Sequence, residues 1–172
     1  MSAEELVDVV DEDDRVVARA TRAEVRRRKL RHRCTYVLVF NARGQLLVHQ
    51  RTLQKDIFPG YWDVTIGGVL GSGEDYDAGA ARELYEETGI RAVPLRRLFP
   101  MRYEDGDNKV CGVVYSCTAE QAPHLQASEI VAAEWLDLDA VIERTAKDRF
   151  CPDGLEALRL YLSKLEAARR RR

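Results

Sequence analysis

The feature that most constrains this chain is a fixed spacing of one arginine and several glutamates behind a glycine-rich loop. In residues 68–90, GVLGSGEDYDAGAARELYEETGI, five residues separate Gly68 from Glu74, and seven more precede the run RELYEETGI. Residues 77–88 are good helix formers without proline, and Gly89 stands where a helix end favours a residue that tolerates positive φ. The pattern therefore predicts a tight loop followed by a helix of about three turns.

Three carboxylates share one face of this expected helix. Glu83, Glu86 and Glu87 are three and four residues apart, and like charges at that spacing repel by a few tenths of a kcal/mol per pair. A hard divalent cation would relieve this repulsion, and oxygen-only ligands suit Mg²⁺ or Mn²⁺. Arg82 precedes Glu86 by four residues, so it is placed to pair with that glutamate and hold it in position.

Glutamate-rich helices are most often solvated surfaces, so the glutamates alone would not indicate a site. The complete pattern, however, resembles the Nudix box, G-x5-E-x7-R-E-U-x-E-E-x-G-U with U a bulky aliphatic residue, at every defined position. Its glycines also stand where a loop must turn into a helix, which is the context that such a motif requires. We therefore interpret the segment as a catalytic motif.

The Nudix resemblance implies an α/β fold, an α/β/α sandwich with a mixed β-sheet. It implies a pyrophosphohydrolase that cleaves a diphosphate linkage in a nucleotide or a nucleoside diphosphate-linked compound, with metal-bound water as the nucleophile. Glu86 and Glu87 match the family's metal ligands, Glu83 is either a ligand or the general base, and the Gly67 carbonyl is a further expected ligand. Arg82 completes the expected catalytic set. Glu74 is expected to support the loop.

Residues 30–69 also resemble type 1 isopentenyl-diphosphate isomerases, a branch of the Nudix superfamily, and their hydrolase relatives. Where those isomerases carry a catalytic cysteine, a glycine and a metal-binding histidine, residues 67–69 are Gly-Gly-Val, which can perform neither function. The isomerases' later glutamate pair falls near Asp107 and Lys109. His32 matches an isomerase ligand but lacks the partners, so we expect a loop or strand-edge residue. A hydrolase is favoured. The alternatives are an isomerase-like protein and a non-catalytic nucleotide-binding module, which would have lost the glutamates.

Candidate substrate contacts flank the motif. Arg51 and Lys55 stand where isomerase relatives hold a diphosphate, so they are expected to bind phosphate oxygens, with solvated surface charge as the alternative. Aromatic residues near the expected site either stack on a nucleobase or pack in the core, and Trp62 and Tyr103 are selected as substrate contacts from a set that also includes Phe58 and Tyr61. Glu104 is the first choice for a metal ligand outside the box, and Glu129 the second.

Composition favours a single domain spanning residues 1–172. At 172 residues and 45% hydrophobic, the chain can bury one sizeable core. A net charge of −2 gives no general attraction to nucleic acid or membranes, and no segment resembles a signal peptide or a membrane span, so we expect a cytoplasmic enzyme with a small-molecule substrate. The four cysteines lack CxxC spacing, so reduced thiols are expected. The N-terminal strands could form the interface of a homodimer.

Hydrophobic pattern and turn residues predict the order of elements. An N-terminal hairpin and helix occupy about 5–30, a core about 34–137 and C-terminal helices about 138–170. Strands are expected at 5–10, 15–20, 35–40, 45–51, 62–66, 92–103, 110–118 and 134–136. The strands at 35–40 and 45–51 should form a hairpin, and residues 53–61 a loop. Helices are expected at 21–30, 77–88, 139–149 and 153–170.

Overall fold

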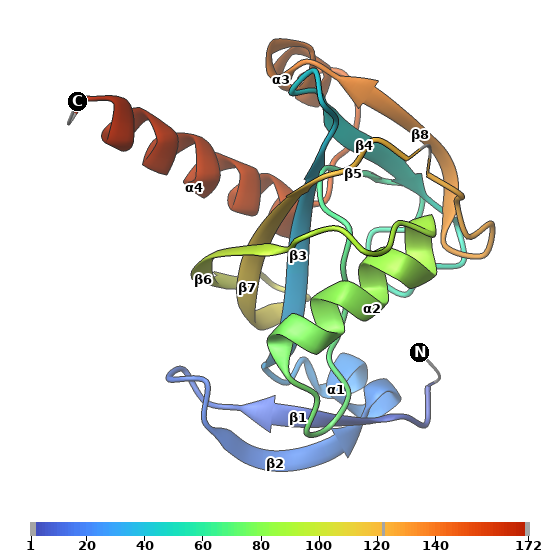
Figure 1. Ribbon diagram of the computed structural model, residues 1–172. Helices are drawn as coiled ribbons and strands as arrows, with labels where there is room; N and C mark the ends of the chain where they lie inside the picture. Colours follow the sequence, from blue (N-terminus) through green and yellow to red (C-terminus); the bar gives the residue numbers. More distant parts are fainter. Residues whose placement is uncertain (1–2, 122, 171–172) are drawn as a thin grey trace.

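The computed structural model describes residues 3–121 and 123–170. Its elements, in chain order, are β1 (Leu6–Val10), β2 (Val16–Thr21), α1 (Arg22–Arg28), β3 (His32–Phe40), β4 (Leu46–Arg51), β5 (Trp62–Asp63), α2 (Tyr76–Thr88), β6 (Arg96–Glu104), β7 (Lys109–Thr118), β8 (Ile130–Leu136), α3 (Leu138–Thr145) and α4 (Pro152–Arg169). Figure 1 shows their arrangement, with β3 running through the centre of the molecule.

The N-terminal hairpin and helix are confirmed. β1 and β2 pair in antiparallel register from Leu6 opposite Thr21 to Val10 opposite Val16. Thr21 then caps α1, because its hydroxyl accepts a hydrogen bond from the Glu24 backbone N–H at 3.2 Å. β1 joins the rest of the sheet where Val9 pairs with His32.

The central strand β3 pairs mainly with a strand far along the chain. It runs parallel to β7 for its whole length, from His32 opposite Val110 to Phe40 opposite Thr118. The predicted hairpin with β4 is wrong beyond its turn, because β3 and β4 pair only at Phe40 and Leu46. From there β4 diverges and pairs antiparallel with β8 instead.

The segment between β5 and the motif helix fills the gap between the diverging strands. Trp62 and Asp63 pair with β4, whereas Ile66 and Val69 form single bridges with Val37 and Cys34 of β3. The predicted strand at 62–66 is therefore only two residues long, since the chain leaves one strand to reach the other. This crossing brings the two glycines at 67 and 68 to the motif helix.

The motif helix α2 is confirmed at Tyr76–Thr88. Asp75 caps its start by accepting hydrogen bonds from the backbone N–H groups of Asp77 and Ala78. Gly89 ends it at φ 69°, where its N–H bonds to the Tyr85 carbonyl. The end at Gly89 was predicted from the sequence, whereas the Asp75 cap was not, and the helix begins one residue earlier than predicted.

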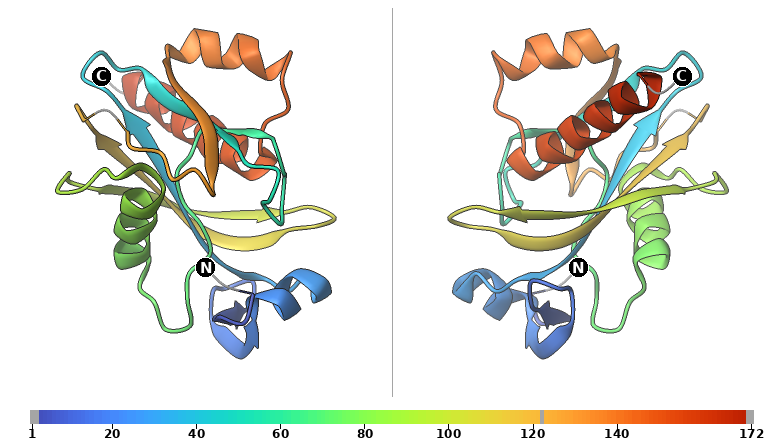
Figure 2. Two further views of the ribbon diagram at one scale, coloured as in Figure 1. Left: turned by 90° about the vertical axis from the view of Figure 1, so that its right-hand side faces the viewer. Right: turned by 90° about the vertical axis from the view of Figure 1, so that its left-hand side faces the viewer.

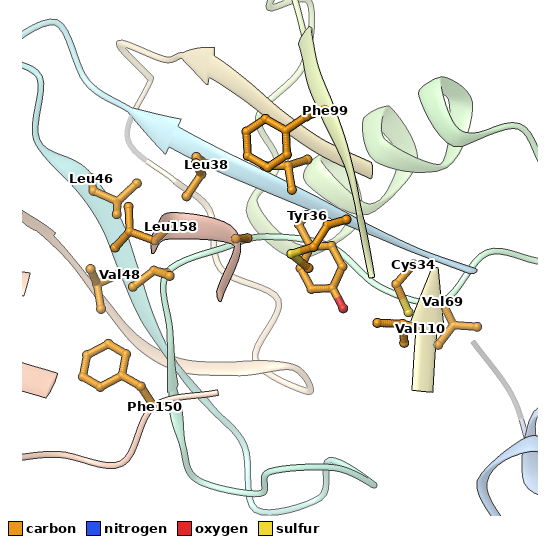
Figure 3. Packing of buried hydrophobic residues seen from close by; sticks show 14 of the residues in the cluster. Cys34, Tyr36, Leu38, Leu46, Val48, Val69, Phe99, Val110, Phe150 and Leu158 are labelled. Carbon is orange, nitrogen blue, oxygen red and sulfur yellow. The ribbon is translucent and has the colours of Figure 1, made fainter. Parts of the chain in front are cut away.

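Helices cover both faces of the sheet, which confirms the predicted α/β/α class. α2 and α4 lie on opposite sides of β3 and β7 in Figure 2. One hydrophobic cluster joins the sheet to Ala157 and Leu158 of α4, and Figure 3 shows Leu158 beside Leu46 and Val48. A second cluster packs Ala80 and Leu84 of α2 against the opposite face.

Several element boundaries differ from the predictions. β8 has seven residues rather than three, β6 begins at Arg96 rather than 92, and α3 ends at Thr145 rather than 149. His32 is the first residue of β3, but it is buried between neighbours in β1 and β7 rather than at an edge of the sheet. The four cysteines are free thiols, all buried. Among the described residues, no helix is both long and apolar enough to cross a membrane.

Candidate functional site

A cavity of about 240 Å³, here called the glutamate cavity, lies beside the motif helix. Its lining comes from α1, the loop after β4, the crossing segment, α2 and the loop before β8, namely Arg22, Gln54, Lys55, Asp56, Gly67, Gly68, Val69, Glu83, Glu86, Glu87, Gln126, Ser128 and Glu129. The loop before β8 is held against the end of α2, because the N–H groups of His124 and Gln126 bond to the carbonyls of Thr88 and Glu87. Figure 1 shows this loop running beside the end of the helix.

Arg82 connects the glutamates of the motif. Its Nε and Nη2 donate to the two carboxylate oxygens of Glu74 at 2.7 and 2.9 Å. Its Nη1 donates to Glu83 at 2.8 Å and to Glu86 at 3.0 Å. Glu74 in turn accepts a hydrogen bond from the Gly71 backbone N–H at 2.9 Å. A planar guanidinium with several donors thus fixes three carboxylates relative to the glycine loop.

Two of the motif glutamates are buried. Glu83 and Glu87 are 8% and 4% exposed, whereas Glu86 lies at the surface. Burial raises the pKa of both carboxyls, of Glu87 to about 7, against the opposing attraction of Arg82 for Glu83 and of Lys55 for Glu87. The buried carboxylates therefore lack sufficient compensating charge from the protein, and a cation in the cavity would stabilise their ionised forms.

Lys55 already supplies one positive charge to this cavity. Its ammonium lies 3.4 Å from Glu87 Oε1 and forms an ion pair with Glu129. Two hydrogen bonds join the loops that carry Lys55 and Glu129, since the Thr52 N–H and hydroxyl donate to the carbonyls of Glu129 and Ser128. Burial lowers the pKa of Lys55, while Glu87 opposes this shift.

Gly67 and Gly68 allow backbone to line the cavity. A Cβ at Gly67 would overlap the backbone carbonyl of Thr35, and a Cβ at Gly68 would lie 2.8 Å from Glu83 Oε1. The N–H groups of Thr35 and Val37 in β3 donate to the carbonyls of Gly68 and Ile66. These backbone hydrogen bonds to β3 do not use the Gly67 carbonyl. The carbonyl predicted as a metal ligand is therefore available on a residue of the cavity wall.

These groups fit a divalent cation, although the side chains are engaged with each other. The expected donors, Gly67, Glu83, Glu86 and Glu87, line one cavity and offer only oxygen, the element that Mg²⁺ and Mn²⁺ prefer. The Lys55 ammonium between two carboxylates shows that the cavity attracts positive charge. Within residues 3–121 and 123–170, no three acidic, histidine or cysteine side chains form a ready-made metal site.

The structure brings some of the other predicted residues to the site and not the rest. Arg51 lines a second cavity of about 90 Å³, here called the inner chamber, and Lys55 lines both cavities. Glu129 lines the glutamate cavity, whereas Glu104 lines neither and pairs with Arg31 and Lys109. Of the two candidates for a metal ligand outside the motif, Glu129, the second choice, is therefore better placed than Glu104, the first choice.

The aromatic residues selected from the sequence lie elsewhere. Trp62 packs under Arg144, whose guanidinium carbon is 3.7 Å from the ring centroid. Tyr103 packs at the core edge and donates to Asp105 at 2.8 Å. Neither side chain lines the glutamate cavity or the inner chamber, whereas Phe58 lines the inner chamber. This geometry gives the predicted substrate contacts of Trp62 and Tyr103 no support.

Sequence reasoning missed Arg22 and Arg26, which α1 brings to the cavities. α1 reads as an ordinary basic surface helix, and only the folded sheet shows that its arginines face the site. The loop segment 126–128 was missed because it has no motif of its own. Asp153, at the start of α4, lines the inner chamber from the far end of the chain, where no local pattern could have identified it.

Comparison with known proteins agrees with the motif. The NUDIX domain family matches residues 30–158. An uncharacterized Nudix hydrolase of Pseudomonas aeruginosa is 42% identical over 158 residues, which cover 92% of this chain and 94% of that protein. The uncharacterized Nudix hydrolase YfcD of Escherichia coli (strain K12) is 37% identical over 164 residues, 95% of this chain and 90% of that protein.

Solved structures show the same fold. DR0079 from Deinococcus radiodurans has a TM-score of 0.80 and 28% identity, covering 91% of this chain and 99% of that one. The NUDIX domain of NrtR from Shewanella oneidensis, solved with ADP ribose, has a TM-score of 0.63 and 20% identity over 77% of this chain and 87% of that one. These relatives leave the resemblance to isomerases untested. The matched motif, fold and relatives together establish that the chain belongs to the Nudix hydrolase family.

Proposed function

We propose that this protein is a Mg²⁺- or Mn²⁺-dependent pyrophosphohydrolase that cleaves a diphosphate linkage in a nucleotide or a nucleoside diphosphate-linked compound. The observation that carries the proposal is the convergence of Glu83, Glu86 and Glu87 on one cavity with Gly67 and the half-buried Lys55. This set provides both acidic ligands for a cation and positive charge for a phosphate group. The small net charge favours a small-molecule substrate in the cytoplasm over nucleic acid or a membrane.

In the proposed mechanism, Gly67, Glu83, Glu86 and Glu87 would hold the cation. When bound, the ion lowers the pKa of a water ligand and neutralises charge on the phosphates. Arg82 keeps Glu83 and Glu86 in fixed positions through its hydrogen bonds at 2.8 and 3.0 Å. Glu83 either completes the ligand set or accepts the proton of the attacking water. In neither case must the side chain travel far.

Lys55 has a second role in this proposal. Lys55 pairs with Glu87, one of the residues that would hold the cation, and with Glu129, and its ammonium is placed to contact a phosphate oxygen of the substrate. Arg51 lies in the inner chamber next to the same lysine, so the two residues are suited to bind phosphates on the side away from the motif helix. We therefore keep Arg51 and Lys55 as proposed contacts for the phosphate oxygens of the substrate.

The isomerase alternative is disfavoured by the space at position 67. In the resemblance to isomerases, this position corresponds to the catalytic cysteine, and in this protein a Cβ would overlap the Thr35 carbonyl. A side chain could enter only if β3 moved. The chain therefore lacks both the thiol and the room for one.

The test is to incubate the protein with nucleoside di- and triphosphates, nucleotide sugars, ADP-ribose, dinucleoside polyphosphates and isopentenyl diphosphate, with Mg²⁺, Mn²⁺ or EDTA. We expect metal-dependent release of phosphate or a nucleoside monophosphate, reduced at least about a hundredfold in Glu87→Gln. Glu143→Gln, at an exposed position on α3, is the matched control and should keep wild-type activity. Tight nucleotide binding without cleavage would instead establish a binding module, and conversion of isopentenyl diphosphate without phosphate release an isomerase.

A further inference from the structure

Three residues that line the inner chamber carry buried polar atoms without a hydrogen-bond partner among the described residues. The chamber adjoins the glutamate cavity, and both share Lys55 and the backbone at 67–69. We propose that the inner chamber is an oxyanion-binding subsite, in which Arg26, Arg51 and Thr35 bind a phosphate group of the substrate other than the diphosphate that is cleaved. The identity of this group as part of a substrate rests on the proposed function, whereas the anion site itself does not.

Arg26 is a partly buried arginine of α1 that lines the inner chamber. Its Nη1 lies 3.2 Å from Asn108 Oδ1 and 3.4 Å from His32 Nε2, so both of these neighbours are neutral groups. Its Nε is buried without a hydrogen-bond partner. Burial lowers the pKa of this arginine, the direction expected for a guanidinium with too little compensating negative charge. A bound anion would compensate that charge.

Arg51 and Thr35 also carry buried atoms without a hydrogen-bond partner. Arg51 Nη2 donates to the Ile57 carbonyl at 3.1 Å and its Nη1 lies 3.8 Å from Asp63 Oδ2, but its Nε is buried and without a partner. Thr35 is 1% exposed, and its hydroxyl oxygen also lacks a partner. The residues that carry these three buried atoms line the chamber together with Arg22 and Lys55, so its lining holds four basic side chains and only two carboxylates. This excess of positive charge, and the N–H donors of the guanidinium groups, suit an oxyanion, which accepts hydrogen bonds.

The size of the chamber limits what can enter. One water molecule needs about 10–15 Å³ of cavity volume. The inner chamber, at about 90 Å³, therefore accommodates roughly six water-sized groups. A phosphate group fits within this space, whereas a purine ring is larger. The chamber is therefore suited to a compact anionic group rather than to a nucleobase.

Two carboxylates also line the chamber, and both are engaged. Asp63 Oδ1 accepts hydrogen bonds from the N–H and hydroxyl of Thr65 at 3.1 and 3.0 Å. Asp153 accepts from the Tyr36 hydroxyl at 3.0 Å and from the Gly154 N–H at 3.1 Å. Burial and the nearby Asp63 raise the pKa of Asp153 to about 6, which reduces its negative charge in mildly acidic solution. Asp63 Oδ2 also lies 3.8 Å from Arg51 Nη1, but neither acid forms a hydrogen bond to the unpartnered atoms of Arg26, Arg51 and Thr35.

A phosphate bound in the inner chamber would narrow the class of substrates. If a phosphate occupies the inner chamber while a diphosphate lies in the glutamate cavity, the substrate carries a further phosphate beyond the linkage that is cleaved. A diphosphate compound with an additional phosphoryl group is then preferred over the same compound without that group. The preference should show in KM, because the chamber lies away from the motif glutamates.

The test is titration with inorganic phosphate in EDTA at constant ionic strength, followed by isothermal calorimetry and ³¹P NMR, with acetate as the carboxylate probe. We expect saturable phosphate binding to the wild-type protein, about tenfold weaker in Arg26→Gln and about threefold weaker in Thr35→Val. Arg27→Gln, an exposed neighbour on α1, is the matched control and should bind within about twofold of wild type. Acetate binding with the same dependence on Arg26 would identify a general oxyanion site rather than a phosphate site and would overturn the phosphate assignment.

The design separates this inference from the proposed function. Because EDTA removes divalent cations, phosphate binding does not depend on hydrolysis. If Arg26→Gln loses phosphate binding and the wild-type protein hydrolyses no substrate, the proposed anion site is supported and the proposed hydrolase activity is refuted. The opposite outcome is hydrolysis by the wild-type protein together with equal phosphate affinity in all variants, or with no saturable phosphate binding. That outcome would support the proposed hydrolase activity and refute the proposed anion site. Thr35→Val provides the same comparison if Arg26→Gln fails to fold.

Discussion

The ammonium of Lys55 lies 3.4 Å from the carboxylate oxygen Oε1 of Glu87, on the helix that carries the motif glutamates. Because the same ammonium pairs with Glu129, one lysine stands between acidic residues from two separate segments. A divalent cation entering this cavity must therefore compete with a protein cation for the same carboxylates. We therefore expect Lys55 to lower the affinity for metal and to supply positive charge to the phosphates.

This competition predicts the behaviour of Lys55→Met, which keeps an apolar stem and removes the charge. Mn²⁺ should bind about three- to tenfold more tightly to the variant, since a competing charge has been removed, while KM for substrate should rise. Calorimetric titration with Mn²⁺ measures the first effect and steady-state kinetics the second. Lys147→Met, at an exposed position, should change neither. Unchanged Mn²⁺ affinity in Lys55→Met would show that the lysine does not compete.

A second prediction concerns the shape of the Arg82 side chain. Arg82→Lys keeps the charge but cannot maintain the bonds to Glu74, Glu83 and Glu86 together, so we expect a loss of about 2 kcal/mol in the free energy of unfolding. Urea unfolding measures it. In Arg159→Lys the bidentate pair with Glu156 is exposed, so the loss in stability should be much smaller than in Arg82→Lys. Equal losses in the two variants would argue against a special role for Arg82.

The close approach at Gly67 predicts a specific sensitivity. In Gly67→Ala the new methyl group would overlap the Thr35 carbonyl, so the free energy of unfolding should fall by about 3 kcal/mol and metal binding should weaken. Gly106→Ala is the matched control, because a Cβ at Gly106 meets no atom within 4 Å. Thermal unfolding of both variants provides the comparison. A Gly67→Ala protein as stable as Gly106→Ala would contradict the close packing of Gly67 against β3.

Buried His32 predicts a dependence of stability on pH. Burial and the nearby charges of Arg26 and Arg22 lower its pKa from 6.5 to about 4, while its Nδ1 bonds to the Leu30 carbonyl. Between these two pKa values the unfolded chain binds more protons than the folded protein, so acidification favours unfolding. From pH 7 to pH 5 this histidine should cost the wild-type protein about 2 kcal/mol.

The measurement is urea unfolding of wild type and His32→Gln at both pH values. Glutamine does not titrate, so the difference in stability between the two proteins should change by the stated amount. Carboxyls with raised pKa, such as Asp153, act in the opposite direction but affect both proteins equally. A constant difference between the proteins at the two pH values would show that His32 is protonated in the folded state.

Features with local signals were predictable from the sequence. The end of α2 was predicted from Gly89, which caps the helix that it adjoins; the Asp75 cap at the start is equally local but was not named. The motif residues follow from the same segment, because a helix places positions three and four apart on one face. The fold class followed from the family resemblance and from the alternation of elements.

Features that depend on distant pairing were not predictable. The turn after Phe40 reads as a hairpin, yet β3 continues beside β7 and β4 beside β8. Nothing near Phe40 signals this divergence, because the competing partners lie far along the chain. Arg26 and Glu129 were missed or ranked second for the same reason, since α1 and the loop before β8 meet the site only after the sheet has formed.

The parallel pairing of β3 with β7 also has a consequence for synthesis of the chain. β3 ends at Phe40 and β7 ends at Thr118, so 118 − 40 = 78 further residues must be made before the pair can be completed. At about 5–20 residues per second, one edge of the central strand stays open on the ribosome for about 4–16 s. An open strand edge can pair with another chain during that interval. Nascent chains of this protein are therefore most vulnerable to aggregation before the segment at 109–118 emerges.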